Sequence, residues 1–192
     1  MSERVSERVS VSERVSESLR ALLAGAVDYA GLFPPAGLPM SEAARLYAGY
    51  ESGPHAWMLG HFVVPDARLA EFAQAAESVL PVGRRPWRLS VLLSDDADAD
   101  MAAVAAFNAS HGGAVCDAVE CKASTLDDMT RIARAVRAGD VATYVEIPFV
   151  DDPTPRIGAL ATHGLRAKIR AGGTTPGAFP PAADVARFLG AC

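Results

Sequence analysis

The sequence has little that would place the protein in a membrane or on a nucleic acid. No apolar run approaches the roughly 18 residues needed to cross a bilayer, and the amino terminus lacks the apolar core of a secretory signal. Acidic residues outnumber basic ones, 23 to 18, and the net charge of −5 gives no basic footprint for nucleic acid or an anionic membrane. We therefore expect a cytoplasmic protein with neither nucleic-acid nor membrane partners.

Cysteine is also scarce, and this bears on redox state and on metals. The three cysteines are an odd number and no signal sequence accompanies them, which favours a reducing cytoplasm. Cys116 and Cys121 lie in one expected strand at a spacing that would put them on opposite faces, so no disulfide is expected. There is no CxxC pair and no HxxxH or HExxH spacing. The sequence thus predicts neither a structural zinc site nor a cofactor.

The chain has the length of one domain, with 192 residues of which 50% are hydrophobic and 21% charged. Its start, "MSERVSERVSVSERVS", is a low-complexity repeat whose serines compete for backbone hydrogen bonds. We expect residues 1–16 to be disordered or loosely helical, and residues 17–192 to form a single domain.

Apolar stretches then alternate with helical ones. Helices of about 10 to 15 residues separate the apolar stretches, which indicates βαβ units and a parallel sheet. The stretches are "GAVDYAGLF", "AWMLGHFVVP", "WRLSVLLS", "AVCDAVECKA", "VATYVEIPFV" and "LRAKIRA".

Six such units indicate an α/β fold of the TIM-barrel type that is incomplete, because a closed (β/α)₈ barrel has eight. The alternative is an open, doubly wound parallel sheet. No GxGxxG turn is present, and polar residues interrupt the strands, whereas central strands of open sheets tend to be apolar on both faces. These two features favour the barrel.

Alternation of side chains along each strand separates an apolar face from a charged one. In "LRAKIRA" the cations alternate with Leu165, Ala167 and Ile169. Active sites of (β/α) barrels lie at the carboxyl ends of the strands. The charged residues that we predict at this rim are Glu120, Lys122, Glu146, Lys168 and Arg170.

An ammonium group that is buried without a partner is costly, so we expect Glu146 on the preceding strand to pair with Lys168. A lysine in a dry lumen beside a second cation can lose its proton and attack a carbonyl as a Schiff-base nucleophile. Glutamates at positions 120 and 146 would then move protons. The alternative is an ion network without chemistry. The residues that suit an anionic group are Arg170, Lys122, Gly172, Gly173 and Thr174.

The stretch "DYAGLFPPAGL" places Asp28 at the end of the first expected strand, ahead of an apolar loop with two prolines. Such a loop would either cover the mouth of the barrel, with Asp28 adding a carboxylate to the substrate site, or pack against a helix. His61 is interpreted as a core histidine with satisfied hydrogen bonds.

The stretches "DYAGLFPPA", "AWMLGHFVVP" and "AKIRAGG" resemble a family of uncharacterised bacterial proteins of the actinobacterial type. The resemblance covers Leu19 to Cys192. Members of that family are longer, which implies that this chain is a form truncated at its carboxyl end. No activity comes with this resemblance.

The stretch "AKIRAGG" is also similar to class I aldolases of the deoxyribose-phosphate aldolase type, in which a strand lysine is followed by a turn of small residues at the phosphate site. The resemblance implies that Lys168 forms the Schiff base and that Gly172 and Gly173 hold the anion. Arg170 departs from it, because that family has a small residue there.

From these observations we hypothesise a lyase or aldolase-like barrel that acts on a small anionic carbonyl compound. One alternative is a sugar-isomerase-like enzyme in which Glu120 and Glu146 hold Mg²⁺ or Mn²⁺. The other is a truncated fragment without activity, which would associate with a second copy through its open sheet edge.

Overall fold

The computed structural model of the protein describes residues 17–83, 85–136, 141–173, 175 and 178–192. The repeat of residues 1–16, for which disorder or a loose helix was expected, lies outside the described residues, as does Thr174. None of the described helices is long and apolar enough to span a membrane.

Strands and helices alternate along the described chain, as the sequence predicts. The strands are β1 (Val27–Tyr29), β2 (Leu59–Pro65), β3 (Trp87–Leu92), β4 (Ala114–Lys122), β5 (Ala142–Glu146) and β6 (Arg166–Lys168). The helices are α2 (Glu17–Leu23), α3 (Met40–Glu51), α4 (Leu69–Ala76), α5 (Ala97–Ser110), α6 (Leu126–Val136), α7 (Thr154–Thr162) and α8 (Ala182–Ala191), with 3₁₀ turns η1 (Ala56–Met58) and η2 (Asp66–Arg68).

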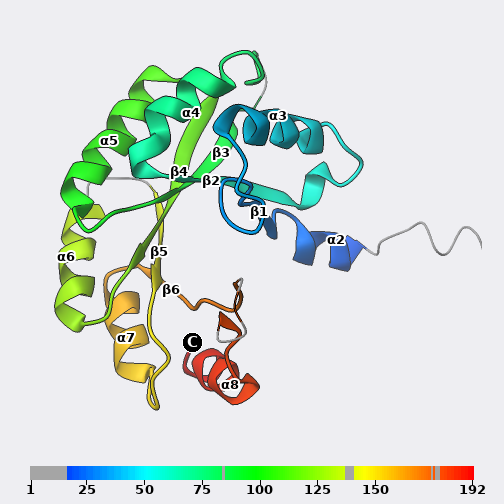
Figure 1. Ribbon diagram of the computed structural model, residues 1–192. Helices are drawn as coiled ribbons and strands as arrows, with labels where there is room; N and C mark the ends of the chain where they lie inside the picture. Colours follow the sequence, from blue (N-terminus) through cyan, green and yellow to red (C-terminus); the bar gives the residue numbers. More distant parts are fainter. Residues whose placement is uncertain (1–16, 84, 137–140, 174, 176–177) are drawn as a thin grey trace, which may run out of the picture.

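The six strands form one parallel sheet whose spatial order is the order of the sequence, β1-β2-β3-β4-β5-β6. A doubly wound sheet reverses direction at a switch point, and this sheet has no reversal, so it is wound in one direction like a barrel. Figure 1 shows the helices as an arc that runs from α3 through α5 and α6 to α7 and α8. The fold is thus an incomplete TIM-barrel-like half barrel, as predicted.

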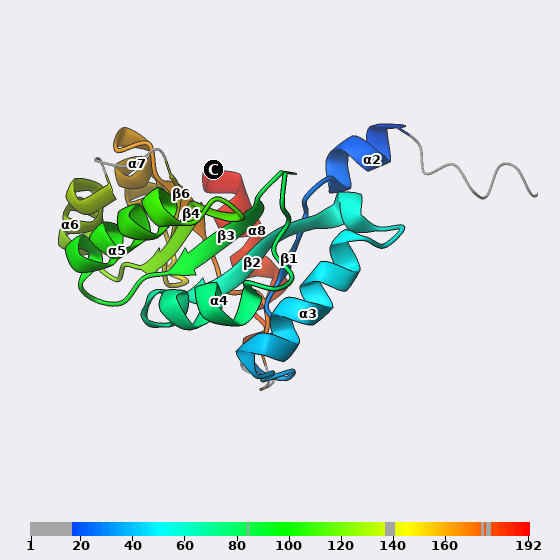
Figure 2. The ribbon, with the colours of Figure 1, turned by 90° about the horizontal axis from the view of Figure 1, so that it is seen from above.

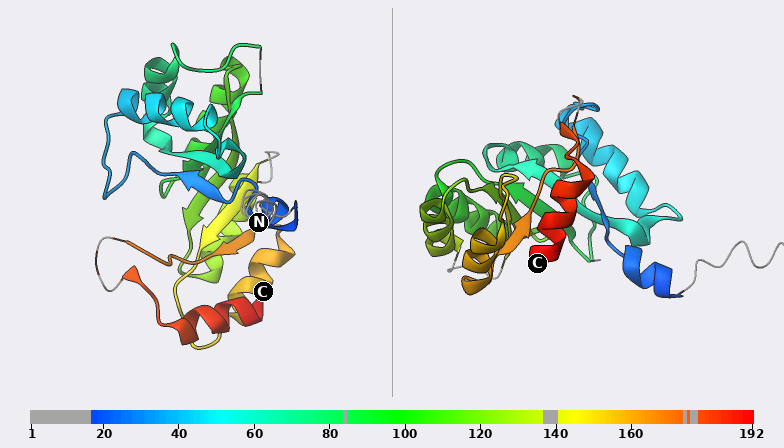
Figure 3. Two further views of the ribbon diagram at one scale, coloured as in Figure 1. Left: turned by 90° about the vertical axis from the view of Figure 1, so that its right-hand side faces the viewer. Right: turned by 90° about the horizontal axis from the view of Figure 1, so that it is seen from below.

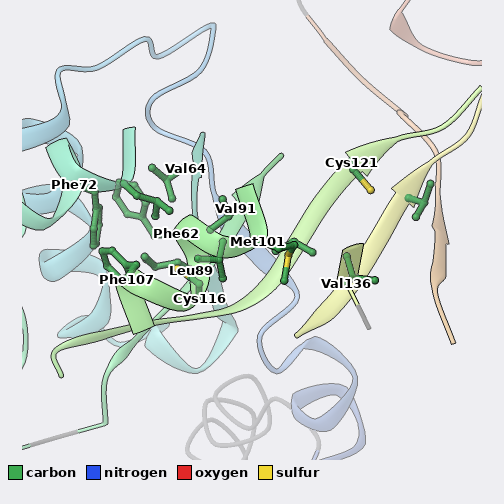
Figure 4. Close-up of a cluster of buried hydrophobic side chains, with 14 of the residues drawn as sticks. Phe62, Val64, Phe72, Leu89, Val91, Met101, Phe107, Cys116, Cys121 and Val136 are labelled. Atoms are coloured by element: carbon green, nitrogen blue, oxygen red, sulfur yellow. The ribbon is translucent and has the colours of Figure 1, made fainter. Parts of the chain in front are cut away.

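The convex face of the sheet and the helices α3 to α7 enclose the hydrophobic core (Figures 1 and 2). Aromatic side chains dominate its first half, where Phe62 lies between Tyr47 and Phe72 with ring centroids 5.4 and 5.1 Å away. The Tyr47 hydroxyl donates a hydrogen bond of 2.9 Å to the carbonyl of Gly60, which satisfies a buried polar group and ties α3 to β2. Figure 4 shows the aliphatic and sulfur-containing residues that continue this core toward β5.

A register shift in β4 changes which residues face the core. Leu89 pairs with Cys116, but the next residue, Ser90, pairs with Ala118, so Asp117 is an extra residue. Cys116 and Cys121 therefore both lie in the core cluster (Figure 4), and the prediction that they face opposite sides is wrong. Both thiols are free, and burial raises the pKa of each to about 12, so neither is a nucleophile at neutral pH.

The loop after β1 packs into the core. Leu32 is buried there together with Met40 of α3, and Phe33 and Leu38 pack against the same cluster. These contacts agree with the second expectation for this loop, that it packs against a helix.

The other face of the sheet is concave, and α3 to α7 do not cover it. Figure 3 looks at this open side, where the strands lie between α3 and α4 at one end and α8 at the other. Among the described residues β1 pairs only with β2, and β6 only with β5. Association of two copies through these edges stays a prediction.

We expect Phe62→Ala to lower the free energy of unfolding by about 3–5 kcal/mol, because it removes a ring that is fully buried among other aromatic rings. Urea denaturation measures the change. Phe179→Ala is the matched control, since Phe179 is 61% exposed and its loss should change stability by less than about 1 kcal/mol. Equal effects of the two substitutions would contradict the assignment of the core.

Candidate functional site

Polar side chains line the concave face on every strand. Their neighbours along each strand, such as Phe62, Leu89 and Val145, are buried in the convex core, so alternation turns the polar residues the other way. We call this set the polar belt: Asp28 on β1, His61 on β2, Arg88 and Ser90 on β3, Asp117, Glu120 and Lys122 on β4, Tyr144 and Glu146 on β5, Arg166 and Lys168 on β6, and Arg170 just after β6.

The amine of Lys168 forms an ion pair with Glu120 Oε2, and Ser90 Oγ donates a hydrogen bond of 2.8 Å to Glu120 Oε1. Both carboxylate oxygens of Glu120 are thus engaged. The side chain of Glu120 is 12% exposed, whereas that of Lys168 is 32% exposed. A partly exposed lysine side chain is therefore paired with a largely buried carboxylate.

The structure does not pair Lys168 with Glu146, the partner predicted from the sequence. Glu146 is the register neighbour of Lys168, but it contacts Arg170, whose Nε and terminal nitrogen each lie 3.4 Å from its oxygens. Strands of a curled parallel sheet are tilted, so side chains at one level come from successively shifted positions on neighbouring strands. Lys168 reaches diagonally across β5 to Glu120 for this reason.

The carboxyl-terminal halves of β4, β5 and β6 carry an excess of positive charge, although the net charge of the whole protein is −5. Arg166 donates a hydrogen bond of 2.6 Å to the hydroxyl of Tyr144, and Lys122 is exposed and forms no ion pair with a described residue. From the level of Glu120 to the end of these strands, four cations face two carboxylates: Lys122, Arg166, Lys168 and Arg170 against Glu120 and Glu146. This excess of cations favours an anionic ligand.

A second cluster of the polar belt lies on β1 to β4, and the sequence reasoning missed most of it. Asp28 Oδ1 accepts a hydrogen bond of 2.6 Å from the backbone N–H of His61 and lies 3.1 Å from Nδ1 of its ring. The other ring nitrogen, Nε2, is buried 3.1 Å from Asp117 Oδ1, although the two are not aligned as a hydrogen bond. Arg88 Nε donates a hydrogen bond of 2.5 Å to Asp117 Oδ2.

Only the register shift in β4 brings Asp117 into this cluster. Strict alternation along β4 from Glu120 assigns Asp117 to the core face, and the extra residue reverses that assignment. A second shift, between β1 and β2, accompanies the contact of Asp28 with His61. The isolated Gly60 in β2 is a sequence signal for the second shift, because a glycine inside a strand often marks a bulge. No residue pattern in β4 indicates the first shift, so the place of Asp117 in the cluster could not be found from the sequence.

The pKa of the Asp28 carboxyl lies below its ordinary value. Burial acts to raise the pKa, but the hydrogen bonds from His61 and the charges of His61 and Lys168 outweigh it. Asp28 is therefore a carboxylate at neutral pH. The positive charge of Lys168, on the edge strand at the other end of the sheet, contributes to the lowering of its pKa.

The loop after β6 folds back on itself at the predicted anion turn. A Cβ atom at Gly173 would lie 2.6 Å from the Cβ of Ala178, and one at Gly172 would lie 3.7 Å from the ring of Phe179. Close packing thus explains the glycine at position 173. An anion-binding role for Gly172 and Gly173 stays a prediction.

Hollows also occur away from Lys168 and Arg170. One of about 720 Å³ lies between α4 and the turn at His111 and is lined by no residue of the polar belt, whereas one of about 620 Å³ beside α5 is lined in part by Asp117. No group of three or more His, Cys, Asp or Glu residues in the described ranges is arranged to hold a metal ion. Glu120 and Glu146, the expected metal ligands, each face a cation instead.

Comparison with known proteins adds no assignment, since no family model, curated protein or solved structure matches the chain. The two resemblances noted in the sequence therefore stay predictions.

A double-mutant cycle should find that Lys168 is coupled to Glu120 and not to Glu146. We expect a coupling free energy of about 0.5–3 kcal/mol for Lys168→Met with Glu120→Gln, as for groups in direct contact. The same cycle with Glu146→Gln should give less than about 0.5 kcal/mol. Chemical denaturation of the single and double variants measures both values. A larger coupling free energy with Glu146 than with Glu120 would support Glu146, the partner predicted from the sequence.

The stabilisation that Asp28 contributes should disappear in acid. A carboxyl whose pKa is lowered by folding stabilises the protein above its unfolded-state pKa, and this stabilisation is lost as pH falls through the folded-state value. Asp28→Asn should therefore lower the free energy of unfolding at pH 7, by up to about 1 kcal/mol for this half-exposed group, and the difference should shrink below about pH 4. Asp127→Asn, at an exposed position of α6, is the control. A difference that grows in acid would contradict the assigned direction.

Proposed function

We propose that the concave face at the carboxyl ends of β4 to β6 binds a small anionic carbonyl compound, and that Lys168 attacks its carbonyl carbon. The reaction class is that of a lyase or class I aldolase. The observation that carries the proposal is the ion pair of Lys168 with Glu120, in which a partly exposed lysine side chain is paired with a largely buried carboxylate.

Schiff-base formation suits this pair because it conserves charge. The ammonium first loses a proton to Glu120, and the neutral amine adds to the carbonyl carbon to give a carbinolamine. In the carbinolamine the former carbonyl oxygen carries a proton from the amine, and Glu120 gives it a second proton, so that it leaves as water. Ammonium and iminium each carry one positive charge, so Glu120 is a carboxylate counter-ion at the beginning and again at the end.

The cations around Lys168 support the anionic character of the substrate. Arg170 is 59% exposed and only loosely paired with Glu146, so its guanidinium can still donate hydrogen bonds to two oxygens of a carboxylate or phosphate. Lys122 adds a second charge at the level of Lys168 in the sheet. Glu146 would take or return the proton when the iminium withdraws electrons from the neighbouring carbon.

No observation favours the metal-dependent alternative over this one. A carboxylate that binds Mg²⁺ or Mn²⁺ through both oxygens must release its present partners, and Glu120 would have to release both Ser90 and Lys168.

We expect borohydride to trap a covalent adduct at Lys168 when the protein is incubated with pyruvate or dihydroxyacetone phosphate. Reduction of the iminium gives a stable secondary amine, which peptide mass spectrometry locates. Lys168→Ala should abolish the adduct, and Glu120→Gln should slow its formation by roughly 10²-fold or more, as for loss of a general acid–base group.

Lys122→Ala is the comparison variant, because it removes a lysine from the same face that does not touch Glu120. It should raise the ketone concentration needed for trapping, since it removes a cation from the proposed anion site, but the adduct should still form at Lys168. An adduct that persists in Lys168→Ala, or none with the wild-type protein, would remove Lys168 from the proposed role.

A further inference from the structure

Asp28 occupies the edge strand opposite Lys168, and the surrounding backbone is shaped to admit its carboxylate. A Cβ atom at Gly60 would overlap Asp28 Oδ1 and would lie 2.7 Å from the carbonyl oxygen of Gly25. Any side chain at position 60 would therefore displace the carboxylate. Position 60 is a glycine because Asp28 lies against it.

His61 holds Asp28 in one orientation. Its backbone N–H and its ring nitrogen Nδ1 both approach Oδ1, at 2.6 and 3.1 Å. A carboxylate can only accept, so the second contact is a hydrogen bond when Nδ1 carries a proton. On the other side of the ring, Nε2 lies 3.1 Å from Asp117, which Arg88 holds in place by a hydrogen bond.

His61 itself cannot act on a ligand through Nε2, because that atom is buried against Asp117. It is thus a positioning residue. Asp28, by contrast, has a side chain that is 44% exposed. The hydrogen bonds and the ion pair of Asp28 with described residues all use Oδ1, which leaves Oδ2 able to accept a hydrogen bond from a ligand.

The polar belt thus presents three different groups around one concave surface. Lys168 on β6 offers an amine, Arg170 beyond it offers a guanidinium, and Asp28 on β1 offers a fixed carboxylate oxygen. Contacts from both ends of the sheet meet on β4, where Lys168 pairs with Glu120 and His61 lies beside Asp117, three residues away. The charge of Lys168 also contributes to the lowered pKa of Asp28. A ligand that spans the surface meets cations at one end and an acceptor at the other.

We infer that the substrate is a carbonyl compound with an anionic group at one end and a hydroxyl or ammonium group at the other, and that Asp28, positioned by His61 and Asp117, binds the latter. This inference rests on the proposed function, since Lys168 must engage the carbonyl between the two ends.

Two ketones that differ only at the far end test it. Dihydroxyacetone phosphate carries a hydroxyl group opposite its phosphate, and acetol phosphate carries hydrogen there. The concentration that gives half-maximal borohydride trapping at Lys168 should be lower for dihydroxyacetone phosphate by about tenfold or more, the effect of one hydrogen bond to a charged group. Asp28→Asn should bring the two concentrations within about threefold of each other by weakening only the hydroxylated ketone.

Two substitutions of His61 separate positioning from folding. His61→Asn keeps a donor near the place of Nδ1 and should retain the preference for the hydroxylated ketone. His61→Leu should lose it, while both variants still trap acetol phosphate as the wild type does. Asp127→Asn controls for the loss of a negative charge, and thermal unfolding verifies that each variant is folded.

The outcomes distinguish this inference from the proposed function. Trapping at Lys168 with no preference between the ketones, or a preference that Asp28→Asn leaves unchanged, overturns the inference and leaves the proposed function standing. Absence of trapping with either ketone in the wild-type protein overturns both.

Discussion

The ion pair between Lys168 and Glu120 exists only because the sheet is curled. The two residues are on strands separated by β5, and in a flat sheet the register would bring Lys168 beside Glu146 instead. Curvature and tilt bring diagonal positions to one level of the concave face, so contacts skip a strand or shift by two residues. The hydrogen bond from Ser90 to Glu120 follows the same diagonal, two residues away from the register pair of Ser90 with Ala118.

That geometry also explains how much of the molecule could be predicted. Alternating apolar and helical stretches predicted the parallel half barrel, because each βαβ unit is defined locally and neighbours in sequence become neighbours in space. Alternation along β5 and β6 likewise placed Glu146, Lys168 and Arg170 on one face. These features depend on short-range periodicity, which a single sequence records.

The pairing within the site depends on features that a sequence does not record. Strand tilt decides that Glu120 and not Glu146 meets Lys168, and one extra residue in β4 decides that Asp117 turns toward His61. His61 was assigned to the core because a lone histidine beside apolar residues fits that role. That interpretation is wrong, because His61 lies on the concave face outside the core cluster and its buried Nε2 has no hydrogen bond. Its place between two carboxylates instead lets it hold Asp28.

The extra residue in β4 has a consequence for the length of this strand. Upstream of Asp117 the core-facing residues are Ala114 and Cys116, and downstream they are Val119 and Cys121, so the strand changes phase once along its course. Deletion of Asp117 would remove this change of phase and leave all four core-facing residues on one face in uniform alternation, with Glu120 still on the other. A β4 strand shorter by one residue would therefore keep the core and the face that carries Glu120, and would lose only the carboxylate that lies beside His61 and Arg88.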